Sequence, residues 1–199
     1  EAAPDAPEPA GEFKFTGVMA CAACHDGPMF NFQFSKWRLS KHAQAWAVLG
    51  TPKGWQIAKD KGVTGDPQKA PQCLKCHATG AGFSLDAYLK GFDIRDGVQC
   101  EACHGPGSEY SPEAIMRDKA GARARGLWTV DTTVCQPCHE QPGGQVFDYE
   151  KSVEKIAHPT RPHKQDVVDE PSYQNPLNAC LTPDGRQLWV TCEASGSVV

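Results

Sequence analysis

The chain reads Cys21-Ala-Ala-Cys24-His25 near its start, and the same Cys-x-x-Cys-His spacing returns three more times in its 199 residues. The later copies are Cys73-Leu-Lys-Cys76-His77, Cys100-Glu-Ala-Cys103-His104 and Cys135-Gln-Pro-Cys138-His139. This spacing is that of a c-type haem attachment site, because its two thiols can bond to the two vinyl groups on one porphyrin edge. The histidine that follows is then placed to coordinate the iron as its proximal ligand. The sequence therefore predicts four covalently bound haems c.

Chance and other uses of cysteine do not explain the repetition. A chain with 10 cysteines and 7 histidines would hold roughly 0.02 copies of the pentapeptide by chance. Zinc knuckles would pair the motifs and would not need a histidine after every second cysteine. A thioredoxin-like dithiol would occur once, beside a βαβ pattern.

The cysteine chemistry also indicates a compartment. Attachment of haem to cysteine takes place outside the cytoplasmic membrane in bacteria and archaea, so we expect a periplasmic or extracellular protein. The chain begins at Glu1 and has no apolar run long enough to span a bilayer, which is typical of a processed exported protein and not of an integral membrane protein. Cys180 and Cys192 lie outside the motifs and can pair as a disulfide in such a compartment.

The charge distribution is uneven. The formal net charge is −4, and each haem adds two propionates, so the loaded protein is acidic. A basic cluster nevertheless occurs at Arg117, Lys119, Arg123 and Arg125. It either docks an acidic redox partner, pairs with propionates, or forms a solvated helix face. Nothing in the composition indicates nucleic-acid binding.

Chain length limits the architecture. Four haems leave roughly fifty residues each, too few for a side-chain core around every cofactor. We therefore expect a mainly α, haem-dense fold of short helices and long loops, with the porphyrins as most of the core and nearly edge to edge. The expected organisation is a flexible leader at 1–12, a tetrahaem domain at 13–160, a Pro-rich linker at 161–177 and a small β element at 178–199.

Local signals predict four helices. Periodic apolar residues favour a helix over 33–49 that carries His42, and capping residues favour helices over 85–90 and from 111 to 121 or 126. A fourth helix is expected between Asp148 and Pro159, with His158 on its last turn. The Gly, Pro and Lys-rich stretch 50–72 is typical of a loop.

The C-terminal stretch has a sequence pattern that differs from the rest of the chain. Residues 181–191 predict strand, Pro-Asp-Gly turn and strand, and they resemble the start of a repeat in the Tyr-Val-Thr-Asn class of β-propellers. One such unit cannot bury its own faces. Either the natural chain continues past Val199, which we favour, or these strands pair with a neighbouring molecule.

The histidine count makes the four haems unequal. Two histidine ligands for each haem would need eight, and the chain has seven. The four motif histidines are proximal, which leaves His42, His158 and His163 for the distal sides. Each of these also has an interpretation without a haem: His42 as a half-buried residue, His158 as a helix-capping residue and His163 as a solvated residue. A homo-oligomer cannot correct the deficit, so at least one haem is five-coordinate or takes another ligand, for which Met116 is the candidate.

The sequence resembles the tetrahaem cytochrome c-554 family over roughly 18–160. The resemblance rests on the Trp-to-His segment that ends at His42, on Gly97-Val-Gln-Cys100-Glu-Ala-Cys103-His104-Gly-Pro-Gly107, and on Phe147-Asp-Tyr-Glu leading to His158. It implies a mostly helical fold with stacked haem pairs, and a second haem, at His77, that lacks a protein sixth ligand.

One departure from the family stands out. The family places a further distal histidine soon after the Gly-Pro-Gly of the third motif, and 108–126 contains none here. Met116 or His163 is the candidate substitute, and His163 can come from an adjacent subunit, which would build a multihaem filament.

These features favour electron transfer with redox partner proteins, as a carrier or conduit, over catalysis. The alternative is a redox enzyme that acts on a small nitrogen oxide, hydroxylamine or peroxide at one open haem. A third possibility is a haem-bearing scaffold that polymerises or anchors a propeller.

Overall fold

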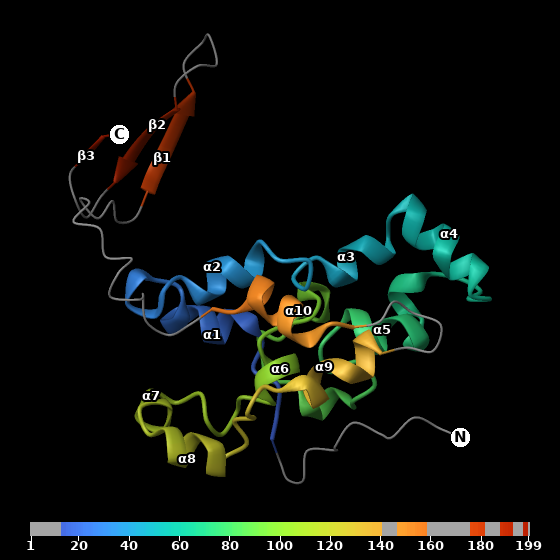
Figure 1. The fold of residues 1–199 in the computed structure, drawn as a ribbon, viewed down its shortest axis with the longest axis horizontal. Helices are drawn as coiled ribbons and strands as arrows, with labels where there is room; N and C mark the ends of the chain where they lie inside the picture. The colour runs from blue at the N-terminus through green and yellow to red at the C-terminus, as the bar shows by residue number, and fades with distance from the viewer. Residues whose placement is uncertain (1–12, 141–146, 159–175, 182–187, 193–196, 199) are drawn as a thin grey trace. The chain divides into compact units, whose positions relative to one another are not determined.

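The computed structural model describes residues 13–140 and 147–158 with their side chains, and the backbone of strands at 176–181, 188–192 and 197–198. The chain separates into two units, Glu1–Arg161 and Pro162–Val199, and each is described by itself (Figure 1). All four haem motifs lie in the first unit.

Short helices dominate the first unit. Within its described residues the only β pairing is an isolated bridge between Phe15 and Tyr88. The prediction of a mainly α fold with short helices and long loops is confirmed. The helices are α1 (Val18–His25), α2 (Gln33–Arg38), α3 (Ala45–Leu49), α4 (Pro52–Asp60), α5 (Pro71–His77), α6 (Glu101–His104), α7 (Glu113–Met116), α8 (Lys119–Ala124), α9 (Thr132–His139) and α10 (Tyr149–Ile156).

Each haem motif occupies the end of a helix. The motif histidine is the last helical residue of α1, α5, α6 and α9. The two cysteines of a motif are three positions apart, so helical geometry places both thiols on the same face, next to that histidine. A c-type motif is therefore presented as a single helical turn.

The predicted helix over 33–49 is wrong in its middle. The chain forms α2 and α3 with a turn between them, and His42 lies in this turn instead of on a helix. The His42 carbonyl accepts hydrogen bonds from the backbone N–H of Ala45 (3.1 Å) and from that of Val98 (3.0 Å). The Trp37 indole in turn donates to the Val98 carbonyl (2.8 Å). Tertiary hydrogen bonds to the distant Val98 thus interrupt a periodic helical pattern.

Other helix boundaries differ from the predictions in smaller ways. The predicted loop 50–72 contains α4, because Thr51 caps it by accepting from Gly54 N–H (3.1 Å) and Pro52 starts it. The segment predicted as helix 85–90 is a single 3-10 turn, Leu85–Ala87. The helix expected from 111 onward is divided into α7 and α8, because Asp118 caps α8.

The helix that leads to His158 begins as predicted. The Asp148 side chain caps α10 by accepting from Lys151 N–H (3.1 Å). The helix ends at Ile156, so His158 lies two residues beyond it and not on its last turn. Ala157 has already left helical geometry (ψ 133°), and the proline that follows His158 disfavours the α conformation there.

An aromatic cluster anchors the segment that precedes α1. Phe15 is 6 % exposed, and its ring contacts those of Phe83, Tyr88 and Phe92 at centroid distances of 5.3, 6.0 and 5.8 Å. The backbone N–H of Phe15 also donates to the Ala87 carbonyl (2.8 Å). These contacts fix the chain immediately before the first motif.

The second unit contains a three-stranded antiparallel sheet in the order β1 (Pro176–Leu181), β2 (Leu188–Cys192), β3 (Ser197–Val198). The predicted Pro-Asp-Gly turn lies outside the described residues, and the propeller repeat stays a prediction. The register sets Cys180 opposite Trp189 and Cys192 opposite Pro176. Along β2 these positions are separated by roughly 10 Å, whereas a disulfide needs Cα atoms within about 7 Å.

We therefore expect no disulfide between Cys180 and Cys192. Alkylation of the denatured, unreduced protein should label both thiols, and prior reduction should not raise the number of labels. Mass spectrometry of proteolytic fragments measures this. A cross-linked peptide that contains both residues would contradict the register.

Candidate haem-binding site

The attachment thiols of different motifs lie close to one another. The Cys21 thiol contacts that of Cys100, and the Cys76 thiol contacts that of Cys138. The Cys103 thiol lies close enough to Cys135 for the two to interact electrostatically. Contact with Cys138 lowers the pKa of the Cys76 thiol to about 7, and burial raises the pKa of Cys103 to about 11.

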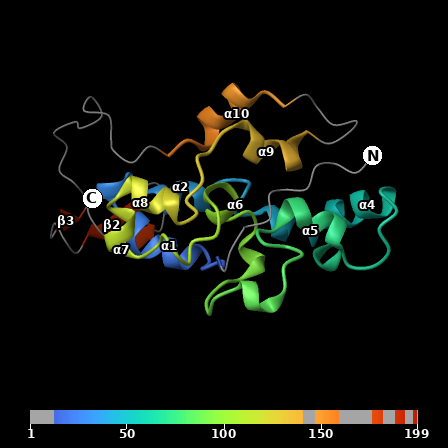
Figure 2. The ribbon, with the colours of Figure 1, turned by 90° about the horizontal axis from the view of Figure 1, so that it is seen from below.

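These pairs arrange the four motifs in a row. The first motif contacts the third through Cys100, the third lies beside the fourth through Cys103, and the fourth contacts the second. In both views α6 and α9 lie between α1 and α5 (Figures 1 and 2). The spatial order of the motifs is therefore first, third, fourth, second, with the first and second at the ends.

Two pairs of histidine rings face one another. The ring centroids are 6.0 Å apart for His42 and His139, and 6.1 Å apart for His104 and His158. Two imidazoles on opposite sides of one metal ion, each bonded at about 2 Å, have ring centres roughly 6 Å apart. The structure thus brings two predicted proximal histidines together with two predicted distal ones, at a spacing that fits an iron between them.

The environment of these rings favours their metal-binding form. Burial, and then the charge of His139, lowers the pKa of His42. Burial also lowers the pKa of His104 to about 4, with smaller contributions from the charges of His158 and His25. A neutral imidazole is the form that coordinates a metal.

Hydrogen bonds orient three of the rings through Nδ1. His25 Nδ1 donates to Gln33 Oε1 (2.5 Å), His77 Nδ1 to the Ala45 carbonyl (2.7 Å), and His158 Nδ1 to the Ile156 carbonyl (2.8 Å). A proton on Nδ1 leaves the Nε2 lone pair free for iron.

Among the described residues, the remaining candidates have no facing histidine ring. In the described part of the chain, ring contacts pair neither His25 nor His77 with another histidine, and His25 lies against Phe30 (5.1 Å). Met116 ends α7, which packs against α8, and no hydrogen bond of the described residues involves its side chain. His163 lies outside the described residues.

Glu101, inside the third motif, was not predicted from the sequence. Its side chain is buried (1 % exposed), and Oε1 accepts from Thr16 N–H (2.8 Å), Gly107 N–H (2.7 Å) and Thr16 Oγ1 (3.2 Å). Its Oε2 accepts from Gly17 N–H (2.8 Å). The sequence did contain a signal for it. A glutamate lies inside the third motif, and the Gly-Pro-Gly that follows lets another backbone segment come close to its carboxylate.

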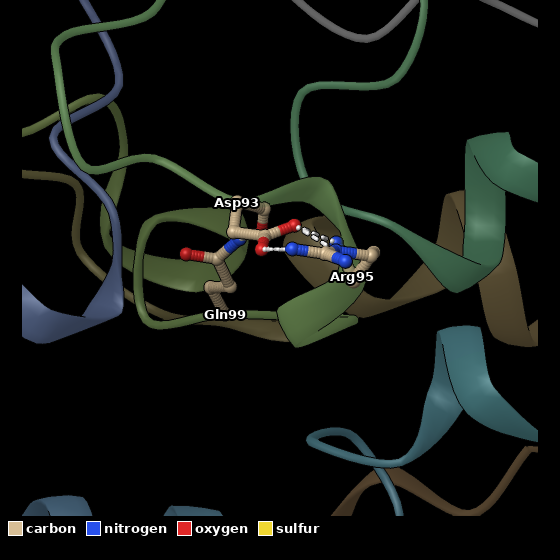
Figure 3. Close-up of polar contacts among 3 residues, drawn as sticks. All are labelled: Asp93, Arg95 and Gln99. Carbon is tan, nitrogen blue, oxygen red and sulfur yellow. Dashed lines mark hydrogen bonds and ion pairs between the residues drawn. The ribbon is translucent and has the colours of Figure 1, made fainter.

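Gln99, on the other side of Cys100, complements Glu101. It is also 1 % exposed, and its Oε1 accepts from Val18 N–H (2.9 Å) while its Nε2 donates to the Asp93 carbonyl (2.8 Å). Figure 3 shows Gln99 beside Asp93, whose carboxylate is bonded to the Arg95 guanidinium (2.6 Å). Three consecutive N–H groups at the start of α1 are therefore bound by the two residues that flank Cys100.

Residues 20–105 match the family described as cytochrome c554 and c-prime. This range includes three of the four haem motifs complete. The match supports a c-type cytochrome. It implies covalently bound haem c with its iron, and electron transfer as the activity. The chain matches no curated protein and no solved structure.

Among the described residues, no helix combines the length and the apolar character needed to cross a membrane.

We predict that Gly97→Ala disturbs the His42–His139 pair. A Cβ at Gly97 (φ +73°) would lie 2.6 Å from the His42 carbonyl oxygen and 3.0 Å from that of Ala43. Positive φ alone costs an alanine about 1–2 kcal/mol. The backbone clash should raise the loss of unfolding free energy to about 3 kcal/mol or more, measured by denaturant titration of the loaded protein.

Gly62→Ala is the matched control, because Gly62 has φ +72° and no atom within 4 Å of its Cβ position. It should lose only the positive-φ contribution and keep the haem spectrum unchanged. An equal loss in both variants would contradict the close approach of Gly97 to His42.

Proposed function

We propose that this protein is a tetrahaem electron conduit that works in the periplasm or outside the cell. The two facing histidine pairs carry the proposal. The four motifs alone indicate only that haem is attached, whereas two histidine rings at a distance that fits an iron between them are typical of an electron-transfer haem. Haem iron that keeps two histidines in both oxidation states changes little in structure when it gains an electron.

The electron path follows from the row of thiols. Haems attached at neighbouring thiols lie edge to edge, so we propose transfer in the order first, third, fourth, second motif. The two inner haems, on His104 and His139, have His158 and His42 as second ligands. The two outer haems, on His25 and His77, lack a second histidine among the described residues and are the natural points of electron entry and exit.

The outer positions connect this conduit to other molecules. We propose His163 as a second ligand at an outer haem, given from the same chain or from an adjacent subunit, with Met116 as the alternative. Donation between subunits would extend the row of haems into a filament. Redox partner proteins would exchange electrons at the ends of that row.

One observation favours a second candidate, a redox enzyme at the haem of His77. A groove of about 330 Å³ lies beside α4, and Val63 in its lining packs in the same cluster as the attachment residue Cys73. The groove is lined by Pro52, Trp55, Gln56, Lys59, Val63 and Gly65. An open iron near it would bind a small nitrogen oxide, hydroxylamine or peroxide.

We predict that His42→Ala and His158→Ala each open one inner haem. Each variant should keep four haems by mass and lose one low-spin bis-histidine signal in the electron paramagnetic resonance spectrum, because the iron loses its sixth ligand. Lys41→Ala, at an exposed position in the same turn as His42, should leave the spectrum unchanged. Unaltered low-spin signals in both histidine variants would contradict the ligand assignment.

We predict that carbon monoxide binds the reduced protein at outer haems only. An open ferrous iron binds carbon monoxide, whereas an iron with two histidines resists it. Optical titration should show binding at one haem of the wild type and at two haems of His163→Ala, and this variant should also shorten any filaments seen by electron microscopy. Binding to none of the four haems would contradict the open outer positions, and turnover of hydroxylamine or peroxide would favour the enzyme.

A further inference from the structure

Glu101 is a buried carboxylate without a counter-ion. It is 1 % exposed, and the four ion pairs of the described residues do not include it. Its hydrogen bonds come from three backbone N–H groups and a hydroxyl, which are all neutral donors. A buried charge normally has a charged partner, so an isolated one calls for a specific role.

The position of Glu101 is between the first and third attachment sites. It follows Cys100 directly, and it binds Thr16 and Gly17 at the start of α1, which carries Cys21. The Cys21 thiol in turn contacts that of Cys100. Haems attached to these two motifs would therefore share one nearby negative charge.

Local dipoles oppose this charge but do not cancel its effect at the irons. The N–H groups that bind Glu101 have their positive ends toward it, and the N-terminus of α1 adds a partial positive charge. The field of a dipole falls off faster with distance than the field of a net charge. At distances well beyond these hydrogen bonds, the net charge of the carboxylate therefore outweighs the dipoles.

From these observations we infer that Glu101 tunes redox potential. Its fixed charge stabilises the ferric over the ferrous state and so lowers the reduction potentials of the haems on the first and third motifs. This rests on the proposed electron conduit. Because Glu101 is the only buried carboxylate among the described residues and lies at one end of the row, it favours electron flow from the first and third haems toward the fourth and second.

The test is potentiometric titration of Glu101→Gln, with all four haems attached and the low-spin signals followed by electron paramagnetic resonance. We expect the signal of the His104–His158 haem to be reduced at a higher potential than in the wild type, and that of the His42–His139 haem to keep its potential. The His158→Ala variant identifies which signal is which.

Two controls separate charge from structure. Glu109→Gln removes an exposed carboxylate eight positions after Glu101 and should shift neither signal, because solvent screens that charge. Thr16→Val removes one hydrogen bond to Glu101 but keeps the charge, so it should reduce stability without raising the potential. No shift in Glu101→Gln, or an equal shift of both signals, would overturn the inference.

A second variant decides the question if Glu101→Gln fails to accumulate with four haems. Glu101→Ser also removes the charge, and its shorter side chain leaves room for water to accept from the same N–H groups, so it should raise the potential of the same His104–His158 signal. An unchanged or lowered potential would overturn the inference. The wild type tests the proposed function separately, since fewer than four haems or no bis-histidine signals would refute the conduit, whatever Glu101 does.

Discussion

The hydrogen bonds between the start of α1 and the two residues that flank Cys100 hold the first and third motifs together. No α-helix satisfies its own first N–H groups, and the N-cap residue of α1, Gly17, has no side chain that could do so. Glu101 and Gln99 supply the missing acceptors from a segment more than eighty residues away. Because these acceptors are adjacent to Cys100, closing the cap also sets Cys21 beside Cys100. One local requirement of helix chemistry thereby sets two of the Cys-x-x-Cys-His motifs side by side.

The small size of a haem motif explains why the helices are short. A motif needs only one helical turn to place two thiols and a histidine on one face, and a longer helix would separate neighbouring motifs. The segments outside the helices then carry the two proposed second ligands. His42 lies in a turn held by Val98, and His158 lies past the end of α10 and is held through its carbonyl by Gln33. Backbone hydrogen bonds, more than side-chain packing, position these two rings.

Motif chemistry and histidine counting were sufficient to predict His42 and His158 as candidate ligands, because both arguments depend only on residue type and spacing. They could not predict the break between α2 and α3, which results from a tertiary bond to Val98. They also missed Glu101, because glutamate is almost never fully buried and composition gives no reason to place it inside. The capping signal at Thr51-Pro52 was present in the sequence, but the Gly, Pro and Lys-rich context favoured a loop.

The distribution of second ligands follows from the row of motifs. In the proposed row, an inner haem would have a neighbouring motif on two sides, and a distal histidine from the same chain would reach it from a nearby turn. An outer haem would have a neighbouring motif on one side only. Under the proposed ligand assignment, the seven histidines are therefore not spread at random. The two inner haems would have two histidines each, and the shortage would fall on the ends of the row, where the proposed conduit exchanges electrons with other molecules.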